Sequence, residues 1–364
     1  MMQSEVQRMK IPRLNIGGLI SKIPIIQGAM GIGVSGPRLA AAVANEGGVG
    51  VIAGVNLGYD EPDFASNPLE ANLRAVKSQI GKARQLAPKG IIGINLMVAM
   101  NHYGEMVRAA AEEGIDLIIS GAGLPLKLPG FVKDLKTRIA PIVSSGKAAR
   151  VISQYWDTHY GRTPDMVIVE GAEAGGHLGF SREVLSAQDR PSIIDILREV
   201  VEAIRPFREK SNKPIPVIAA GGIYTGADIA ECLKSGADGV QMATRFTATD
   251  ECDADIRFKE AYISARKEDV LIIQSPVGMP GRALNNKFIR KLDENGIQIK
   301  RCSQCLTGCN PKIAAYCIST ALINAVRGNI DDGLVFAGSN VYRVDKIMPV
   351  KRLIQELLSD LRLA

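Results

Sequence analysis

The sequence predicts an α/β fold, a closed (β/α)8 TIM barrel with a C-terminal helical cap. Over roughly the first two-thirds of the 364 residues, eight short apolar runs alternate with amphipathic helical patterns. Strands that are apolar on both faces and alternate with helices form parallel sheets covered by helices. A count of eight favours a closed barrel over an open sheet. The predicted strands are residues 23–28, 49–54, 91–97, 116–121, 140–145, 165–171, 216–222 and 238–246.

The helical patterns between these strands end at glycine, the residue that most often follows the last turn of a helix. Clear examples are PRLAAAVANEGG at 37–48, EMVRAAAEEG at 105–114 and GADIAECLKSG at 226–236. The alternation stops near residue 265, and two further helical patterns follow a segment rich in Gly and Pro. We therefore predict a barrel over residues 1–265, and a lid loop with a helical C-terminal cap over residues 266–364.

The composition places the chain among ordinary globular proteins. Hydrophobic residues make up 46% and charged residues 23%, which is enough to build a core and argues against disorder. A net charge of +6 with 5% aromatic residues gives no basis for nucleic-acid binding. The polar N-terminus, the lack of a long apolar run and the absence of cysteine before Cys232 predict a cytoplasmic protein without membrane association. A small-molecule or acyl-thioester substrate is expected, and a homodimer is left open.

Active sites of such barrels lie on the loops that follow the carboxyl ends of the strands. After the first predicted strand, Gly28 precedes Ala29 and Met30, and small residues let a planar ligand lie against the backbone. Later loops supply hydrogen-bonding side chains and a run of small residues. The candidate ligand contacts from these loops are Asn95, Ser144, Glu170 and Gly175.

The loops after the last two strands predict a phosphate site. In many barrels these loops bind phosphate through backbone N–H groups. Here they contain Ala220, Gly221 and Gly222 in one loop, and Ala243 and Thr244 in the other. The alternative is that the glycines only form tight turns. That would account for either loop alone, but it accounts less well for both loops together. We therefore predict a phosphate-bearing ligand.

A dinucleotide fingerprint, G-x-G-x-x-G, occupies residues 31–36. That fingerprint also requires an acidic residue at the end of the second strand. The second strand ends Ala53-Gly54-Val55-Asn56, without a carboxylate. We interpret these glycines as shaping the loop above the first strand.

Among the three histidines, His177 follows a loop of small residues that leaves it room to face a ligand. Imidazole exchanges protons near neutral pH, so His177 is the predicted catalytic acid–base residue. His102 and His159 are expected to be solvated or capping groups on helices.

A cysteine cluster in the C-terminal region has two interpretations. Its members, Cys302, Cys305, Cys309 and Cys317, could bind an iron–sulfur cluster or zinc through four thiolates. Because Cys317 falls at a predicted helix, a set of buried or redox-inert cysteines is favoured, and no metal is predicted.

A basic stretch from Arg282 to Arg301 also has two interpretations. It could meet an acidic partner such as an acyl carrier protein or a nucleotide phosphate. Asp293 and Glu294 interrupt it, which favours a solvated face.

Together these loops resemble the nitronate monooxygenase family, formerly called 2-nitropropane dioxygenases, and the related FMN-dependent enoyl-acyl-carrier-protein reductases. The stretches that carry the resemblance are IPIIQGAMG, GINLM, EGAEAGGHLG, PVIAAGGIYTGADI, GADGVQMATRF and SPVGMPGRAL. Some of the monooxygenases have lysine after the fifth strand, where this chain has Ser144-Ser145.

The resemblance implies a bound FMN with its phosphate at Gly222, Ala243 and Thr244. It further implies that His177 is the active-site histidine, which either binds an anionic nitronate or deprotonates a neutral nitroalkane. The expected activity is oxidation of alkyl nitronates with O2. The alternatives are an NAD(P)H-dependent enoyl-acyl-carrier-protein reductase and a redox-sensing flavin-binding module.

Overall fold

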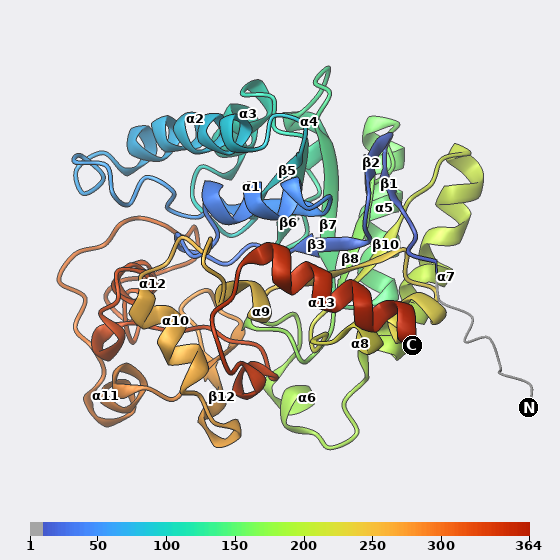
Figure 1. Cartoon of the computed structure of the whole chain (residues 1–364). Coiled ribbons are helices and arrows are strands. Elements are labelled where there is room, and N and C mark those ends of the chain that lie inside the picture. The colour runs from blue at the N-terminus through green and yellow to red at the C-terminus, as the bar shows by residue number, and fades with distance from the viewer. Residues whose placement is uncertain (1–9) are drawn as a thin grey trace, which may run out of the picture.

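The eight predicted strands form a closed parallel barrel in the computed structural model, which describes residues 10–364 (Figure 1). The strand order is β10-β11-β3-β4-β5-β6-β7-β8, and pairing of β8 with β10 closes the ring. The predicted barrel is thus confirmed. The barrel strands are β3 (Ile25–Gln27), β4 (Val49–Ala53), β5 (Ile91–Met97), β6 (Leu117–Gly121), β7 (Arg138–Val143), β8 (Val167–Glu170), β10 (Val217–Ala220) and β11 (Gly239–Met242).

The helices between the strands cover the outside of the barrel. Local sequence sets their ends: the Ser145 hydroxyl accepts from the Ala148 N–H to begin α5, and Gly161 ends it with a left-handed φ of 59°. The outer helices are α1 (Pro37–Asn45), α2 (Pro68–Leu86), α3 (Tyr103–Glu112), α4 (Leu128–Phe131), α5 (Gly146–Tyr160), α7 (Ile193–Ser211) and α8 (Gly226–Lys234).

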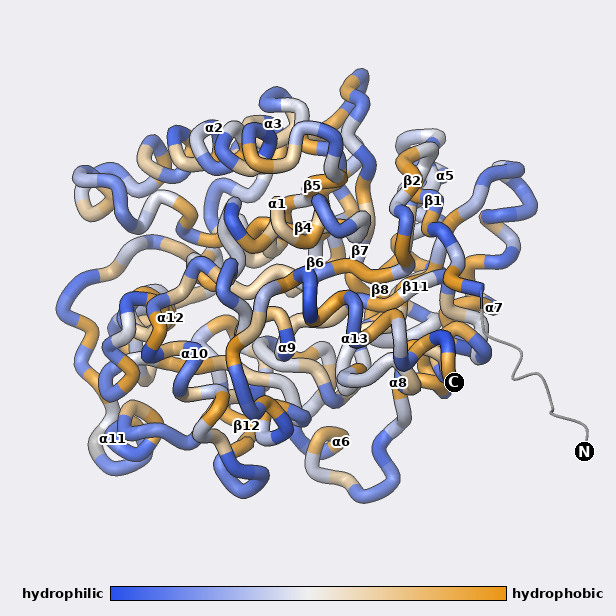
Figure 2. The backbone as a smooth tube through the Cα atoms, viewed as in Figure 1, coloured by the Kyte–Doolittle hydropathy of each residue, from blue (hydrophilic) through white to orange (hydrophobic). Residues whose placement is uncertain are grey.

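Two apolar clusters hold the barrel together. One lies between the strands and the helices, and the other fills the barrel interior, where Ile26, Val51 and Ile168 meet. Leu14 and Ile16 from the hairpin of β1 (Leu14–Ile16) and β2 (Leu19–Ser21) join the interior cluster. Figure 2 shows the corresponding concentration of hydrophobic residues along the central strands. None of the helices over residues 10–364 is both long and apolar enough to span a membrane.

A three-stranded antiparallel sheet joins the C-terminal region to the barrel. Its strands are β9 (Gly176–His177), β12 (Val270–Gln274) and β13 (Pro280–Leu284), in the order β12-β13-β9. His177 pairs with Gly281, so the loop after β8 is bound to a segment a hundred residues further along the chain. The sequence predicts only a lid loop in this segment, because Gly and Pro are frequent in and before β13. Local sequence patterns do not reveal the three-stranded sheet.

The remaining elements surround this sheet and one edge of the barrel (Figure 1). α13 packs against α8 and α1, within the helical layer of the barrel. The division of the chain into barrel and cap at residue 265 therefore stays a prediction. α13, which was expected in the cap, packs against helices of the barrel. These elements are α6 (Arg182–Ser186), α9 (Thr244–Thr247), α10 (Ile256–Ile263), α11 (Lys287–Asn295), α12 (Ile318–Val326), α13 (Val350–Leu363) and the 3-10 turns at Lys267–Asp269, Ile330–Asp332 and Val341–Arg343.

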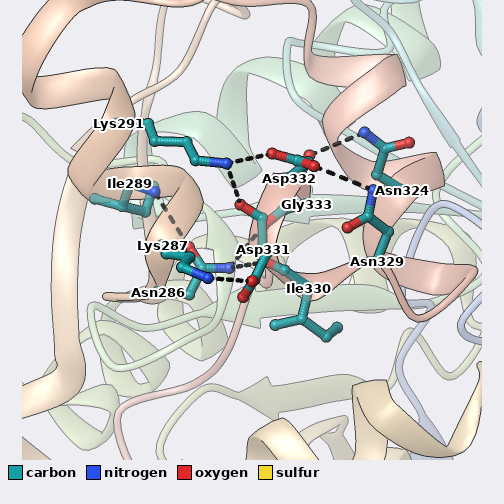
Figure 3. Close-up of polar contacts among 10 residues, drawn as sticks. All are labelled: Asn286, Lys287, Ile289, Lys291, Asn324, Asn329, Ile330, Asp331, Asp332 and Gly333. Atoms are coloured by element: carbon teal, nitrogen blue, oxygen red, sulfur yellow. Dashed lines mark hydrogen bonds and ion pairs between the residues drawn. The ribbon is translucent and has the colours of Figure 1, made fainter.

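Polar contacts bind α11 to the turn that follows α12 (Figure 3). The Asn286 amide donates to the carbonyls of Ile330 and Gly333, at 2.8 and 2.7 Å, and its oxygen accepts from the Ile289 N–H. Lys287 and Lys291 form exposed ion pairs with Asp331 and Asp332. These lysines agree with the solvated face predicted for the basic stretch, but its first residue, Arg282, is buried, so the prediction was wrong there.

Replacement of Asn286 should destabilise this part of the protein far more than replacement of a nearby lysine. Asn286→Ala removes a helix N-cap and the donors of two carbonyls, which we expect to lower the free energy of unfolding by about 2 kcal/mol. Lys291→Ala removes an exposed ion pair and a long hydrogen bond to the Asp331 carbonyl at 3.4 Å, and should cost less than about 0.5 kcal/mol. Urea unfolding followed by circular dichroism compares the two, and equal losses would contradict this account of the network.

Candidate active site

A cavity of about 360 Å³ opens at the carboxyl ends of the barrel strands, beneath the C-terminal region. That volume lies within the range of small-molecule sites. The cavity wall contains nine of the twelve residues predicted from sequence. They are Ala29, Met30, Asn95, Ser144, Glu170, Gly175, His177, Ala243 and Thr244.

The loop above the first strand is closed on itself. The Met30 N–H donates to the Ser35 hydroxyl at 2.8 Å, and the Ser35 N–H donates to the Met30 carbonyl at 3.0 Å. Gly33, with φ of +69°, provides the left-handed residue that the turn requires. The interpretation of the G-x-G-x-x-G stretch as a loop-shaping sequence is therefore confirmed.

A ring of small residues lines one side of the cavity. A Cβ on Gly338 would lie 2.6 Å from the Thr244 hydroxyl, and one on Gly175 would lie 2.6 Å from the Gly338 nitrogen. Gly175 and Gly338 are therefore packed directly against their neighbours, and neither position has room for a side chain. The loop of Gly338 is held beside the loop that follows β10, because the Asn340 amide donates to the Gly222 carbonyl at 2.7 Å. No sequence signal pointed to Gly338, which lies in a loop near the C-terminus.

Several polar atoms around the cavity lack partners. Within residues 10–364, the buried Gln241 Oε1 accepts no hydrogen bond, and the backbone N–H of the buried Gly338 donates none. The N–H of Gly222, which is half-buried and outside the cavity wall, also donates none. Buried backbone donors are nearly always paired. These atoms therefore fit a ligand that carries both acceptors and donors, such as the phosphate and polar chain of FMN. Gln241 lies on β11, two residues before the predicted contact Ala243, and was missed.

The three other predicted phosphate contacts are near the cavity but not in its wall. Ala220 is the buried last residue of β10. Gly221 and Gly222 adopt positive φ values of 96° and 80°, and Gly221 packs against the loop after β8. Their proposed contact with a phosphate stays a prediction.

The surroundings of Glu170, at the end of β8, control its charge. Desolvation raises the pKa of Glu170 to about 8, and the nearby Arg282 guanidinium only partly lowers it. Arg282 is 6% exposed and donates to the Ala174 carbonyl. At neutral pH Glu170 therefore presents a protonated carboxyl group, which can donate a hydrogen bond into the cavity.

His177 lines the cavity from β9 and packs against the C-terminal region. Its Nε2 lies 2.8 Å from the Ser275 hydroxyl, and Phe336 packs edge-on against the ring with centroids 5.1 Å apart. Desolvation lowers the pKa of His177 to about 4, so its imidazole is neutral near pH 7. His102 and His159 are exposed residues at the N-cap of α3 and in α5, as predicted.

Asn95 and Ser144 face the same cavity from β5 and from the loop after β7. The Ser144 hydroxyl donates to the Gly179 carbonyl at 2.9 Å, which leaves its lone pairs to accept. On the opposite wall, the C-terminal region contributes mainly apolar side chains. They are Val277, Met279, Leu306, Ile318, Leu322, Leu334 and Phe336.

The cysteine-rich segment lies over the loop after β5. The Asn101 N–H donates to the Cys305 carbonyl, and Met100 pairs with Leu306. Burial, with smaller effects of the other three thiols, raises the pKa of Cys305 to about 11, which keeps this thiol protonated and unreactive. Cys305 therefore matches the inert cysteine that the sequence favours.

The other members of the cysteine cluster depart from that expectation. Cys302 is exposed, and Cys309 and Cys317 are only partly buried, so of the two properties expected, buried or redox-inert, burial does not hold at Cys302. The reason is local: Cys302 precedes a turn in which its sulfur accepts from the Gln304 N–H, and this turn lies at the surface.

The metal-binding alternative for these cysteines is not supported by their arrangement. Over residues 10–364, no group of three or more His, Cys, Asp or Glu side chains is placed to hold a metal ion. Cys302, Cys305, Cys309 and Cys317 therefore do not form the ligand set that their spacing allowed.

Comparisons with known proteins find relatives of this chain both in sequence and in structure. A "Probable nitronate monooxygenase" of Staphylococcus saprophyticus is 28% identical over 88% of this chain and 87% of its own length. The "(3aS,4S,5R,7aS)-5-hydroxy-7a-methyl-1-oxo-octahydro-1H-indene-4-carboxyl-CoA dehydrogenase" of Rhodococcus jostii is 29% identical over 75% of this chain, and that match spans only 65% of the relative.

Among solved structures, FabK from Thermotoga maritima superposes with a TM-score of 0.71 and 29% identity. The match covers 93% of this chain and 92% of FabK. The sequence profile described as "Nitronate monooxygenase" matches residues 15–360, which include every barrel strand and the C-terminal region. The chain therefore belongs to the nitronate monooxygenase family of oxidoreductases.

Proposed function

We propose that this protein is an FMN-dependent nitronate monooxygenase, which oxidises alkyl nitronates with O2. The observation that carries the proposal is a neutral, desolvated His177 that faces a cavity whose other side has small residues and unpaired polar atoms. Bound FMN would supply the redox chemistry by taking electrons from the substrate. The polypeptide would hold the flavin, exclude water and place His177 against the substrate.

The polar groups of the cavity support FMN as the ligand. The unpaired N–H groups of Gly222 and Gly338 and the Thr244 hydroxyl suit a phosphate. The neutral Glu170 adds no negative charge that would repel it. Other residues in the wall can bind the flavin ring, with Asn95, Ser144 and Gln241 at its polar edges and the backbone of Ala29 and Met30 against its face.

A second candidate is an NAD(P)H-dependent enoyl-acyl-carrier-protein reductase. The apolar wall contributed by Val277, Leu322 and Leu334 favours it, because such a surface suits an acyl chain better than a small nitronate. Both activities would use the same flavin and the same histidine, so the electron donor distinguishes them.

Anaerobic reduction of the flavin tests the function. With a nitronate as the only donor, we expect the flavin absorbance of the purified holoprotein to bleach within seconds. Bleaching by NAD(P)H but not by nitronate would reject the monooxygenase assignment in favour of the reductase.

The variant His177→Ala should keep its FMN but reduce it roughly 100-fold more slowly, through loss of a positioned proton or hydrogen-bond donor. His159→Ala, an exposed change on α5, is the matched control and should behave as the parent.

Gly338 provides a test of the FMN site itself. In Gly338→Ala the new Cβ would lie 2.6 Å from the Thr244 hydroxyl, so this hydroxyl, a proposed phosphate contact, would have to move. We expect at least a tenfold loss of FMN affinity, which is roughly 1.4 kcal/mol, measured by the flavin released on denaturation. Gly81→Ala on α2, where a Cβ meets nothing within 4 Å, is the control. Full occupancy in Gly338→Ala would place the ligand elsewhere.

The raised pKa of Glu170 predicts a dependence of stability on pH. The unfolded chain loses this proton near the ordinary value of 4.5, whereas the folded protein keeps it to about 8. The contribution of Glu170 is therefore full below about pH 4.5 and is lost as the pH rises towards 8. Relative to Glu170→Gln, the ligand-free parent should lose on the order of 2 kcal/mol across that window, after allowance for water in the open cavity.

Urea unfolding of both proteins at about pH 5, 7 and 9 measures this difference. The exposed Glu112→Gln should show no such divergence from the parent. A constant difference between Glu170→Gln and the parent at all three values would mean that Glu170 is ionised at neutral pH.

A further inference from the structure

Asp253, in the segment between α9 and α10, binds the start of α1 through its side chain. Its carboxylate accepts from the Gly36 N–H at 2.8 Å, the Leu39 N–H at 3.1 Å and the Arg38 N–H at 3.3 Å. These are the N–H groups that an α-helix leaves without partners at its first turn. The N-cap residue of α1 is Gly36, which has no side chain to engage them. A carboxylate from a distant segment therefore caps this helix.

The close approach of this carboxylate depends on Gly36. A Cβ on Gly36 would lie 2.7 Å from the carboxyl carbon of Asp253, so no side chain fits there. In dinucleotide-binding proteins the glycines of a G-x-G-x-x-G motif let a phosphate approach the N–H groups at the start of the helix. In this chain the last glycine of the motif admits a carboxylate of the protein itself.

The charge of Asp253 is subject to opposing effects. Desolvation raises its pKa, and the N–H groups of Leu39, Gly36 and Arg38 lower it by stabilising the ionised form. The positive end of the α1 dipole favours the same form. An amide in place of the carboxylate would offer one acceptor oxygen instead of two. The contact with α1 is therefore specific to a carboxylate.

The same segment also holds the loop that precedes α1. The Asp253 N–H donates to the Val34 carbonyl at 3.2 Å, and the Cys252 thiol donates to that carbonyl at 3.3 Å. Val34 and Gly36 are thus both fixed by one short segment. Between them lies Ser35, which is fully buried.

Ser35 extends this restraint to the cavity wall. Its hydroxyl accepts from the Met30 N–H at 2.8 Å, and its own N–H donates to the Met30 carbonyl at 3.0 Å. Met30 and Ala29 both line the cavity. Hydrogen bonds and adjacent residues therefore connect the Asp253 carboxylate, through Gly36 and Ser35, with backbone that faces the ligand.

We propose that Asp253 is a positioning residue for the backbone of Ala29 and Met30. It acts through the loop over residues 29–36, since it is not part of the cavity wall. Here the inference rests on the proposed function, in which this backbone lies against the flavin ring. A loop that is fixed before the ligand binds loses less conformational freedom on binding, which strengthens the affinity.

Removal of the carboxylate should change how the flavin is bound. Asp253→Ala should bind FMN roughly fivefold more weakly. The visible circular dichroism of its FMN-bound form should also differ from that of the parent, because this signal depends on the surroundings of the flavin ring. Asp253→Asn keeps one acceptor oxygen and should lie between the two. The affinity and dichroism of the parent in Asp253→Ala would overturn the proposal.

Asp255→Ala is the matched control. Asp255 caps α10, where its carboxylate accepts from the Arg257 N–H at 2.9 Å. Over residues 10–364, no hydrogen bond joins Asp255 to the loop over residues 29–36. Both alanine variants should lower the midpoint of thermal unfolding, but only Asp253→Ala should alter the flavin dichroism. The same alteration in Asp255→Ala would reduce the effect to a general loss of stability and overturn the positioning role.

Formate provides a second measurement, since it returns a carboxylate to the space that Asp253→Ala leaves. Asp253 is half-buried, so a small anion can reach this space from solvent. Formate should raise both the FMN affinity and the unfolding midpoint of Asp253→Ala, whereas chloride at the same ionic strength should raise neither. The parent should respond equally to the two salts.

The outcomes with formate separate this inference from the proposed function. An equal response of Asp253→Ala to formate and chloride would overturn the requirement for a carboxylate. A parent protein that binds no FMN would reject the proposed function. The unfolding midpoints with formate would still decide whether the Asp253 carboxylate holds the loop.

Discussion

Closure of the barrel between β8 and β10 is the constraint on which the site depends. The register aligns Val217 with Val167 and Ala220 with Glu170, so the loops after these two strands leave the barrel side by side. Parallel strands have all their carboxyl ends at one rim, which brings residues from distant parts of the chain to one cavity. The short strand that carries His177 then pairs with β13, and this second pairing covers the cavity.

Once the cavity is covered, desolvation determines the chemical state of its ionisable groups. The same effect keeps Glu170 protonated and His177 neutral at pH 7, because removal from water disfavours the charged form of each. Both groups therefore offer hydrogen bonds without a net charge. Neither group in its neutral form would repel an anionic ligand, which is the kind of ligand proposed for this cavity.

The parts that could be predicted from the sequence are those with a local signal. Eight apolar runs sufficed for the barrel, and the loops after them identified nine residues of the cavity wall, His177 included, because the fold fixes where those loops lie. Ser275 and Gly338 could not be found in this way. Their roles arise from contacts between distant segments: β9 with β13, and the Gly338 loop with Thr244.

Exposure in the C-terminal region was the least predictable property. Arg282 was assigned to the surface because a basic run gives no sign of the one member that turns inward. Cys302 was assigned to a buried or redox-inert set, and its exposure could not be foreseen, because cysteine is usually buried and the spacing of a cluster does not show which member lies at the surface. The burial of both residues depends on how the C-terminal region folds onto the barrel.

The two walls of the cavity have different origins in the chain. Strand ends and their loops supply most of the polar groups, and the C-terminal region adds the Gly338 N–H. The C-terminal region also supplies the apolar wall and, through Ser275 and Phe336, contacts of His177. Because the two walls come from different segments, residues of the apolar wall can be replaced without any change at the strand ends. This chain is accordingly similar both to a relative named as a nitronate monooxygenase and to one named as a CoA dehydrogenase.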